Sequence, residues 1–344
     1  MIPLAAPDLS EIEERYVLDA LRSGYLTHCG VYEPAFEAAC ERFLGRAPCV
    51  ATSSGTAALH IALLVLGIGP GDEVLVPDLT FGATAAVVVR CGAKPVLVDI
   101  DPETWGIDWQ QAERAITPRT RAVITVHLYG EDCRVPYEFP VPIVEDACEA
   151  FGLVPQRAPL AAYSFYGNKV ITTGEGGLLV GAPDSARLYR DGGFTTDYDM
   201  VVAGLNYRMT NLQAAIGFAQ VQRAPALIAR RQANAAFYAE HLPGRGRWLF
   251  VAETDRPAQL AEHLKANDVE TRPVFRPLHL TQAFKAYAPV AKYEQSVAVW
   301  EHGLALPTGP HVSQEQREDI VRLINGDHNV CEFADRPQQL AQAF

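Results

Sequence analysis

The fold of this chain is decided by residues 161–177, which read AAYSFYGNKVITTGEGG. Two largely apolar runs, at 161–166 and 177–180, flank a turn of threonine and glycine residues. Two such runs predict a β-hairpin at one side of a sheet. Lys169 lies between the first strand and the turn, where it has little room for flexible solvation. Desolvation favours the neutral amine, a nucleophile able to form an imine, although most lysines are solvated surface charges.

Upstream of this hairpin, short apolar runs alternate with helical patterns. Strands are predicted at 73–77, 94–99, 121–126 and 141–145, and helices at 82–91 and 108–116. Strands that alternate with helices indicate βαβ units, and hence a mostly parallel sheet with both faces covered. The chain is therefore predicted to have an α/β fold.

The N-terminal segment is predicted to be helical. Ser10 and Glu13 form a capping box that opens a helix, and Gly24 is placed to end it. Farther along, residues 211–239 form a long helical stretch that we expect Pro225 to interrupt.

A smaller α/β unit is predicted after this stretch. Its expected strands are at 247–251 and 269–274, and its expected helices at 257–267 and 313–324. We therefore expect a large domain over residues 1–240 and a small C-terminal domain over residues 241–344. The tail after residue 325 is polar and predicted to be poorly ordered.

The composition excludes several classes of protein. Of the 344 residues, 49% are hydrophobic and 20% are charged, which is typical of a globular chain and not of a disordered one. The net charge of −12 argues against general affinity for nucleic acid, and no apolar stretch is long enough to span a membrane. The seven cysteines are scattered without a CxxC pair, so we expect reduced thiols, no metal site and a cytoplasmic protein without a secretory leader.

Two further segments carry residues suited to bind a charged ligand. Residues 51–59, ATSSGTAAL, place small residues between a strand and a helix, and the free N–H groups of such a helix end suit a phosphate. Asp146 ends an apolar strand, where a carboxylate could hold a cationic ring nitrogen. Each segment has an ordinary alternative interpretation. The Ser and Thr residues of 51–59, and Asp146, could simply cap the helix that follows, because all three residue types are common helix caps.

A last segment, residues 204–217, is a loop with asparagine and arginine that leads into a helix of small residues. The phosphate cup, Asp146 and Lys169 follow one another in the order expected for pyridoxal 5′-phosphate (PLP) on a fold-type I transferase. In that layout the lysine forms the Schiff base and the acid pairs with the pyridinium nitrogen.

Over residues 2–325 the sequence resembles the DegT/DnrJ/StrS family of sugar aminotransferases. The motifs that carry the resemblance are SGYLT (23–27), TSSGTAAL (52–59), VPDLTF (76–81), VDID (98–101), HLYG (127–130), VEDA (144–147), SFYGNK (164–169), TGEGG (173–177) and NYRMT (206–210). Within the family, SFYGNK, Glu149 and the residues from Thr271 to His279 look most like those of perosamine synthases, which aminate GDP-4-keto-6-deoxymannose. Three loops, at 130–144, 152–161 and 193–201, are shorter than the family's.

The resemblance implies a role for individual residues. Lys169 matches the Schiff-base lysine and Asp146 the pyridinium partner. The other cofactor contacts implied are Gly55, Thr56 and Ser164 at the phosphate, Phe81 on the ring face, Glu149 near the 3′ oxygen, and Asn206 reaching the phosphate from the partner subunit of a homodimer. Thr27, Arg272 and His279 match positions close to the sugar nucleotide.

Three functions remain open at this point. The first is transfer of an amino group from L-glutamate to a keto sugar nucleotide, with Lys169 as the general base. The second is a PLP-dependent sugar dehydratase of the same superfamily, in which a histidine replaces the lysine. The third is a non-catalytic PLP-binding regulatory homologue, which would be free to lose Lys169 and Asp146.

Overall fold

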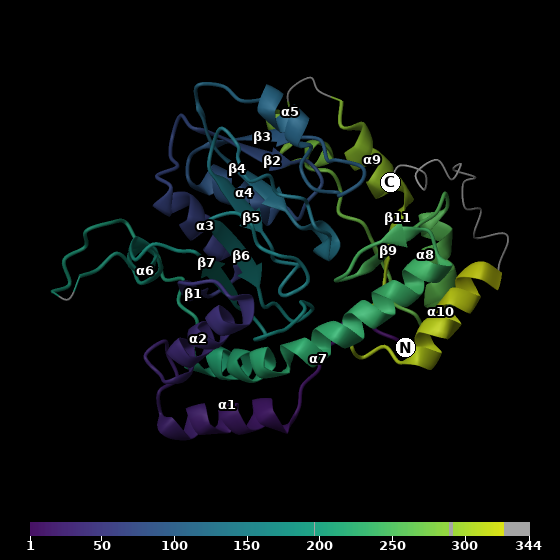
Figure 1. Cartoon of the computed structure of the whole chain (residues 1–344), viewed down its shortest axis with the longest axis horizontal. Helices are drawn as coiled ribbons and strands as arrows, with labels where there is room; N and C mark the ends of the chain where they lie inside the picture. The colour runs from purple at the N-terminus through teal and green to yellow at the C-terminus, as the bar shows by residue number, and fades with distance from the viewer. Residues whose placement is uncertain (196, 289–291, 327–344) are drawn as a thin grey trace.

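The computed structural model describes residues 1–195, 197–288 and 292–326. The predicted polar tail therefore lies, apart from its first residue, outside the described residues. Within these ranges the chain forms two sheets, of seven and four strands, with helices around them (Figure 1).

The larger sheet has the strand order β1-β7-β6-β5-β4-β2-β3. Its strands are β1 (Cys49–Thr52), β2 (Glu73–Pro77), β3 (Lys94–Val98), β4 (Thr120–Val126), β5 (Ile143–Asp146), β6 (Leu160–Ser164) and β7 (Gly177–Val180). Strand β7 is antiparallel to both of its neighbours, and the other neighbouring pairs are parallel. The mostly parallel sheet is thus confirmed. The hairpin of β6 and β7 is inside the sheet and not at its side, because β1 pairs with the far edge of β7.

Helices cover both faces of this sheet. They are α1 (Glu11–Ser23), α2 (Tyr32–Leu44), α3 (Gly55–Val65), α4 (Ala83–Arg90), α5 (Trp109–Arg114), α6 (Ser185–Arg190) and α7 (Asn211–His241), with a 3₁₀ turn η1 (Leu128–Gly130). Consecutive strand residues point to opposite faces. Ala162 and Leu179 pack with α3 and α4 on one face, whereas Tyr163 and Leu178 pack with α2 and α7 on the other.

The ends of α1 and the course of α7 test two predictions. The capping box of α1 is confirmed, since Glu13 Oε2 accepts from the Ser10 N–H at 2.8 Å, and Gly24 ends the helix in the left-handed conformation. The predicted interruption at Pro225 is wrong, because α7 runs through this residue. Packing explains the difference: Val221 and Leu227, on either side of the proline, are buried in the main core and hold the helix together.

The second sheet has the order β10-β11-β9-β8 with antiparallel pairs. Its strands are β8 (Gly244–Arg245), β9 (Phe250–Glu253), β10 (Arg272–Pro273) and β11 (Gly303–Leu306), accompanied by α8 (Pro257–Ala266), α9 (Glu294–His302), α10 (Gln314–Gly326) and the 3₁₀ turns η2 (Leu278–Leu280) and η3 (Lys285–Tyr287). The predicted strand at 269–274 is shorter than expected, because Val269 instead forms an isolated bridge with Ile2.

Helix α7 connects the two sheets. It packs against α1 and α2 near its start and reaches α10 and β8 near its end (Figure 1). The division of the chain at residue 240 stays a prediction. None of the described helices is long and apolar enough to cross a membrane.

Candidate active site

A cavity of about 420 Å³ lies where the parallel strands of the larger sheet end. Most of its walls come from residues at or just after the carboxyl ends of β1, β2, β4, β5 and β6, and the rest comes from the part of the chain after α7. Open α/β sheets bind their ligands at this edge. The lining includes Gly55, Thr56, Phe81, Asp146, Glu149, Ser164, Lys169 and Arg272, so eight of the residues proposed from sequence meet in one place.

One end of the cavity is formed by the first turn of α3. Ser54 caps this helix, because its Oγ accepts from the Ala57 N–H at 3.1 Å. The N–H groups of Gly55 and Thr56 belong to the first turn, which has no acceptors within the helix. A Cβ on Gly55 would lie 2.6 Å from Cys148 Sγ and 2.9 Å from Ser164 Cβ, so glycine is what allows this close approach. The turn can therefore present its N–H groups to an anion.

Asp146 is held at the end of β5 by two hydrogen bonds. Thr84 Oγ1 of α4 donates to Oδ2 at 2.8 Å, and the Cys148 N–H donates to Oδ1 at 3.2 Å. The side chain is buried but lines the cavity. A carboxylate fixed in this way can accept a further hydrogen bond from a ligand in the cavity.

Lys169 reaches the cavity from the turn after β6. Its Nζ lies 3.3 Å from Glu149 Oε1, and Glu149 Oε2 accepts from the Tyr129 N–H at 2.8 Å. Burial raises the pKa of Glu149, and the Lys169 ammonium offsets part of this effect. The amine is thus set between an acidic group and the open cavity.

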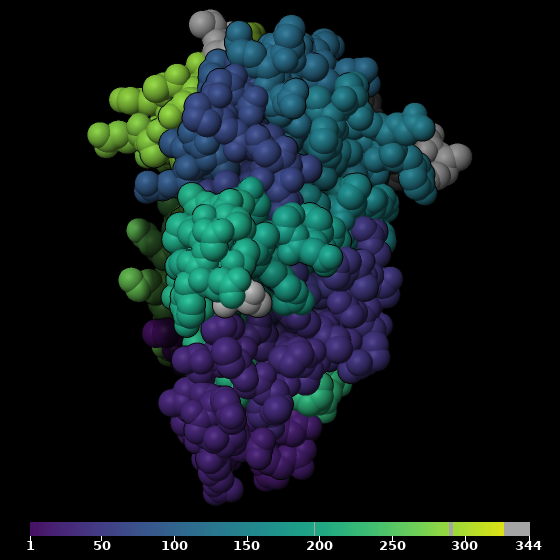
Figure 2. Space-filling model, turned by 90° about the vertical axis from the view of Figure 1, so that its left-hand side faces the viewer, coloured from purple at the N-terminus to yellow at the C-terminus, as the bar shows by residue number. Residues whose placement is uncertain are grey.

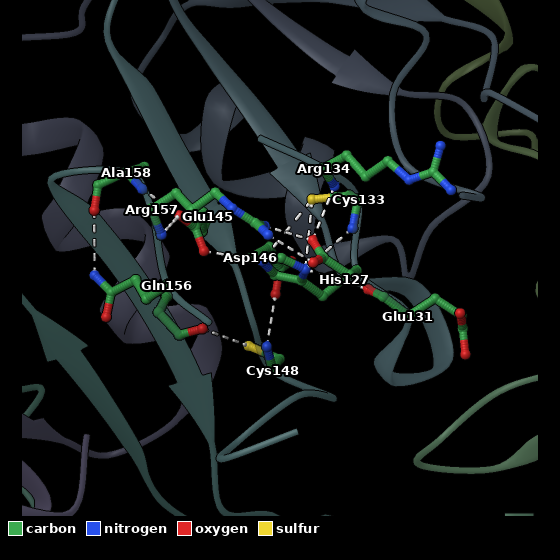
Figure 3. Close-up of polar contacts among 12 residues, drawn as sticks. His127, Glu131, Cys133, Arg134, Glu145, Asp146, Cys148, Gln156, Arg157 and Ala158 are labelled. Carbon is green, nitrogen blue, oxygen red and sulfur yellow. Dashed lines mark hydrogen bonds and ion pairs between the residues drawn. The ribbon is translucent and has the colours of Figure 1, made fainter. Parts of the chain in front are cut away.

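The opposite face of β5 carries a second polar cluster, which does not line the cavity. His127 Nε2 lies 2.9 Å from Glu145 Oε2, and the Arg157 N–H donates to Glu145 Oε1 at 2.6 Å (Figure 3). Complete burial disfavours the charged imidazolium, but the Cys133 sulfur and the Glu145 carboxylate raise the pKa of His127 well above its usual value. The cluster fixes the loops on that face, including the one that begins at His127 and continues with Leu128, which lines the cavity.

An aromatic wall of the cavity was not found from sequence. Trp248 and Phe275 line the cavity, and the Tyr129 ring stacks between them at centroid distances of 6.1 and 5.5 Å. Phe81 is 60% exposed, and the centroid of its ring lies 5.8 Å from that of Phe275. Tyr129 was part of the quoted HLYG motif, but Trp248 and Phe275 are distant in the chain and no local pattern marks them.

Three proposed residues lie elsewhere. His279 does not line the cavity; its Nδ1 lies 2.7 Å from Asp78 Oδ2, and its ring stacks on Tyr293. Thr27 and Asn206 are exposed and also outside the cavity of their own chain. Among the described residues no group of three or more histidine, cysteine, aspartate or glutamate residues could hold a metal ion.

Comparisons with known proteins define the class. Residues 7–325 match the model of the DegT/DnrJ/EryC1/StrS aminotransferase family. A GDP-perosamine synthase of Caulobacter vibrioides is 36% identical over 362 residues, which covers 94% of this chain and 97% of that protein. The putative pyridoxal phosphate-dependent aminotransferase EpsN of Bacillus subtilis is 30% identical over 94% of this chain and 95% of its own length.

Solved structures of sugar aminotransferases superpose on this chain, in agreement with the family match. The PLP form of the putative sugar aminotransferase Spr1654 from Streptococcus pneumoniae superposes with a TM-score of 0.86 at 27% identity, covering 93% of this chain and 97% of that one. DesV of S. venezuelae, solved with a ketimine intermediate, superposes with a TM-score of 0.83 at 30% identity, covering 93% of this chain and 97% of that one.

The fold is thus that of a fold-type I PLP-dependent transferase, as predicted. The chain belongs to the DegT/DnrJ/EryC1/StrS aminotransferase family and is a PLP-dependent sugar aminotransferase. The residues present fit this cofactor. A helix N-terminus faces one end of the cavity, an amine and a carboxylate line it, and the apolar side chains of Val126 and Leu128 form part of its wall.

Replacing Asp146 by asparagine tests the carboxylate. We expect turnover to fall at least about 10²-fold, as for the loss of other preorganised electrostatic groups, because asparagine carries no charge to keep a ring nitrogen protonated. The fold should survive, since the amide oxygen still accepts from Thr84. Turnover is measured with saturating PLP beside the surface variant Asp319→Asn. Normal turnover in Asp146→Asn would show that another group serves the ring nitrogen.

Proposed function

We propose that this aminotransferase moves the amino group of L-glutamate to the ketone of a sugar nucleotide, an NDP-4-keto-6-deoxyhexose such as GDP-4-keto-6-deoxymannose. One observation carries the choice of sugar: three GDP-perosamine synthases are 33–36% identical to the chain over at least 94% of its length. The cavity geometry is compatible with the chemistry that such a reaction requires.

Bound PLP supplies an aldehyde that exchanges amino groups and a ring that withdraws electrons from the carbon next to nitrogen. In the proposed reaction Gly55, Thr56 and Ser164 hold the phosphate, and Phe81 covers the ring face. Asp146 keeps the ring nitrogen protonated. Glu149, which already contacts Lys169, lies beside the oxygen at the 3′ position.

Lys169 moves the protons. Its amine takes the α-proton of the donor amino acid as general base, and in the second half-reaction it delivers a proton to the sugar carbon that gains nitrogen. Because Nζ lines the cavity and rests against Glu149, the amine needs only a side-chain movement to reach both substrates.

Arg272 is placed to attract both substrates. It lines the cavity with a side chain that is 54% exposed, and its nearest carboxylate in the structure, Glu270, is 3.9 Å away. Glutamate and a sugar nucleotide are both anions, so one guanidinium can serve each half-reaction in turn. The proposed substrate contact of His279 stays a prediction; in this structure its Nδ1 lies 2.7 Å from Asp78 Oδ2.

The sugar dehydratase is the second candidate. Lys169 counts against it, since the related dehydratases are expected to have histidine in this place. The two reactions give different products from the same sugar, and a single assay therefore separates them.

The test is to incubate the purified chain with PLP, L-glutamate and GDP-4-keto-6-deoxymannose, with the UDP- and dTDP-linked keto sugars as parallel substrates. We expect an amino sugar nucleotide by mass spectrometry, together with stoichiometric 2-oxoglutarate. A product that has lost water and gained no nitrogen would favour the dehydratase. Amination confined to a UDP- or dTDP-linked sugar would overturn the choice of nucleotide alone.

The positions of Thr27 and Asn206 lead us to propose a homodimer with shared sites. Asn206 bridges to Asp191 at the base of an arm, residues 191–195 and 197–206, that extends from the sheet beyond α6; Figure 2 views the molecule from this side. Several large apolar side chains on the arm and on the nearby loop 24–31 are exposed, among them Tyr25, Val31, Phe194 and Met200. Exposed apolar groups of this kind mark an interaction surface. In the proposed dimer the arm carries Asn206 to the phosphate of the neighbouring site.

Mixing two inactive variants tests this arrangement. We expect Lys169→Ala and Asn206→Ala to be impaired separately, and an exchanged mixture to recover up to about a quarter of wild-type activity, because half of the C₂ dimers would contain one intact site. Light scattering should give twice the 37.5 kDa chain mass. An active monomer, or a mixed dimer without recovery, would contradict the shared site.

A further inference from the structure

The Lys169 amine has a second neighbour besides Glu149. Its Nζ lies 4.1 Å from the centroid of the Trp248 indole, which is within the range of a cation–π interaction. Trp248 is only 2% exposed, and it follows α7, far in the sequence from the turn after β6 that carries Lys169. The ammonium is therefore placed between a carboxylate and a buried aromatic face.

The indole ring is fixed from several sides. Its Nε1–H donates to the Asn168 carbonyl at 2.9 Å, so it is tied to the residue that precedes Lys169. The Trp248 N–H donates to the Tyr129 carbonyl at 2.8 Å, and the Tyr129 N–H donates to Glu149. One residue thus connects the segment of Lys169 with the segment that holds its carboxylate partner.

A buried guanidinium strengthens this connection. Arg231 of α7 is 2% exposed; one of its amino groups donates to the Trp248 carbonyl at 2.5 Å and the other to the Lys169 carbonyl at 3.4 Å. Burial lowers the pKa of Arg231 only to about 10, so it stays charged at neutral pH. The backbones of Trp248 and Lys169 therefore share one rigid support.

This geometry bears on the part of the cycle in which Lys169 is free. A long amine side chain has many rotamers, and it must return to one position to transfer protons. When the amine accepts the α-proton, the C–H bond breaks, the proton moves to Nζ, and the electron pair is left to the cofactor ring. The product of this transfer is an ammonium, the species that an indole face attracts.

We propose that Trp248 is a positioning residue for Lys169, whose indole face holds the ammonium in the cavity whenever the amine is not joined to the cofactor. The inference rests on the proposed role of Lys169. It extends that role to a residue outside the larger sheet.

The test varies the electrostatics of the ring at constant shape. Phenylalanine and pentafluorophenylalanine are placed at position 248, since they have similar size but opposite charge distributions above the ring. Each full-length protein is saturated with pyridoxamine 5′-phosphate, which has no aldehyde and leaves Lys169 free. Brief acetylation with isotopic acetic anhydride is followed by peptide mass spectrometry, with the exposed Lys265 as reference in the same sample.

We expect Lys169 to be acetylated roughly three- to tenfold faster with the fluorinated ring, because loss of the cation–π attraction frees the side chain to meet the reagent. The same pair of residues at position 109, whose tryptophan does not line the cavity, should leave Lys169 labelling unchanged. Equal labelling with the two rings at position 248 would overturn the inference.

Two further measurements keep the outcomes distinct. If thermal unfolding shows that phenylalanine at position 248 is too small for folding, wild-type tryptophan is compared with tetrafluorotryptophan at this position, with the same expectations. Borohydride reduction of the PLP-loaded wild type separates the two proposals. Reduction at another lysine would refute the role of Lys169 itself, whereas reduction at Lys169 with no effect of fluorination would refute only the role of Trp248.

Discussion

Adjacent residues of a β-strand must point to opposite faces of the sheet, and the active site depends on how β5 uses this constraint for two consecutive carboxylates. Glu145 points to one face, where His127 and backbone N–H groups satisfy it completely. Asp146 points to the other face, where Thr84 and one N–H group hold it but leave it at the cavity. A buried carboxylate without partners would be costly, so Glu145 is hydrogen-bonded within the protein, whereas Asp146 also faces the cavity, where a ligand can reach it.

The position of residues at the carboxyl ends of parallel strands explains which part of the site could be predicted from sequence. Gly55, Asp146, Ser164 and Lys169 follow strands that end at one edge, so periodicity and small-residue turns were enough to bring them together. The capping box of α1 was equally predictable, because all of its bonds lie within four residues. Their individual roles in catalysis come from the family resemblance and stay predictions until they are measured.

What sequence could not supply depends on distant packing. The course of α7 through Pro225 is decided by the core on both sides of the helix, against the local preference of proline. Trp248 and Phe275 reach the cavity from the part of the chain after α7, and no nearby sequence motif marks them as residues of the site. His279 and Asp78 are far apart in the sequence, so only the tertiary structure reveals their contact; the role of His279 at the substrate stays a prediction.

We propose that Lys169, and no other lysine, carries the cofactor. The chain has only five lysines, at positions 94, 169, 265, 285 and 292, and Lys169 is the one that lines the cavity among the residues described. Reducing the PLP-loaded protein with borohydride and mapping its peptides by mass spectrometry tests this directly. We expect the modified peptide to contain Lys169 and prior addition of glutamate to abolish the modification. Modification of any other lysine, with Lys169 untouched, would contradict it.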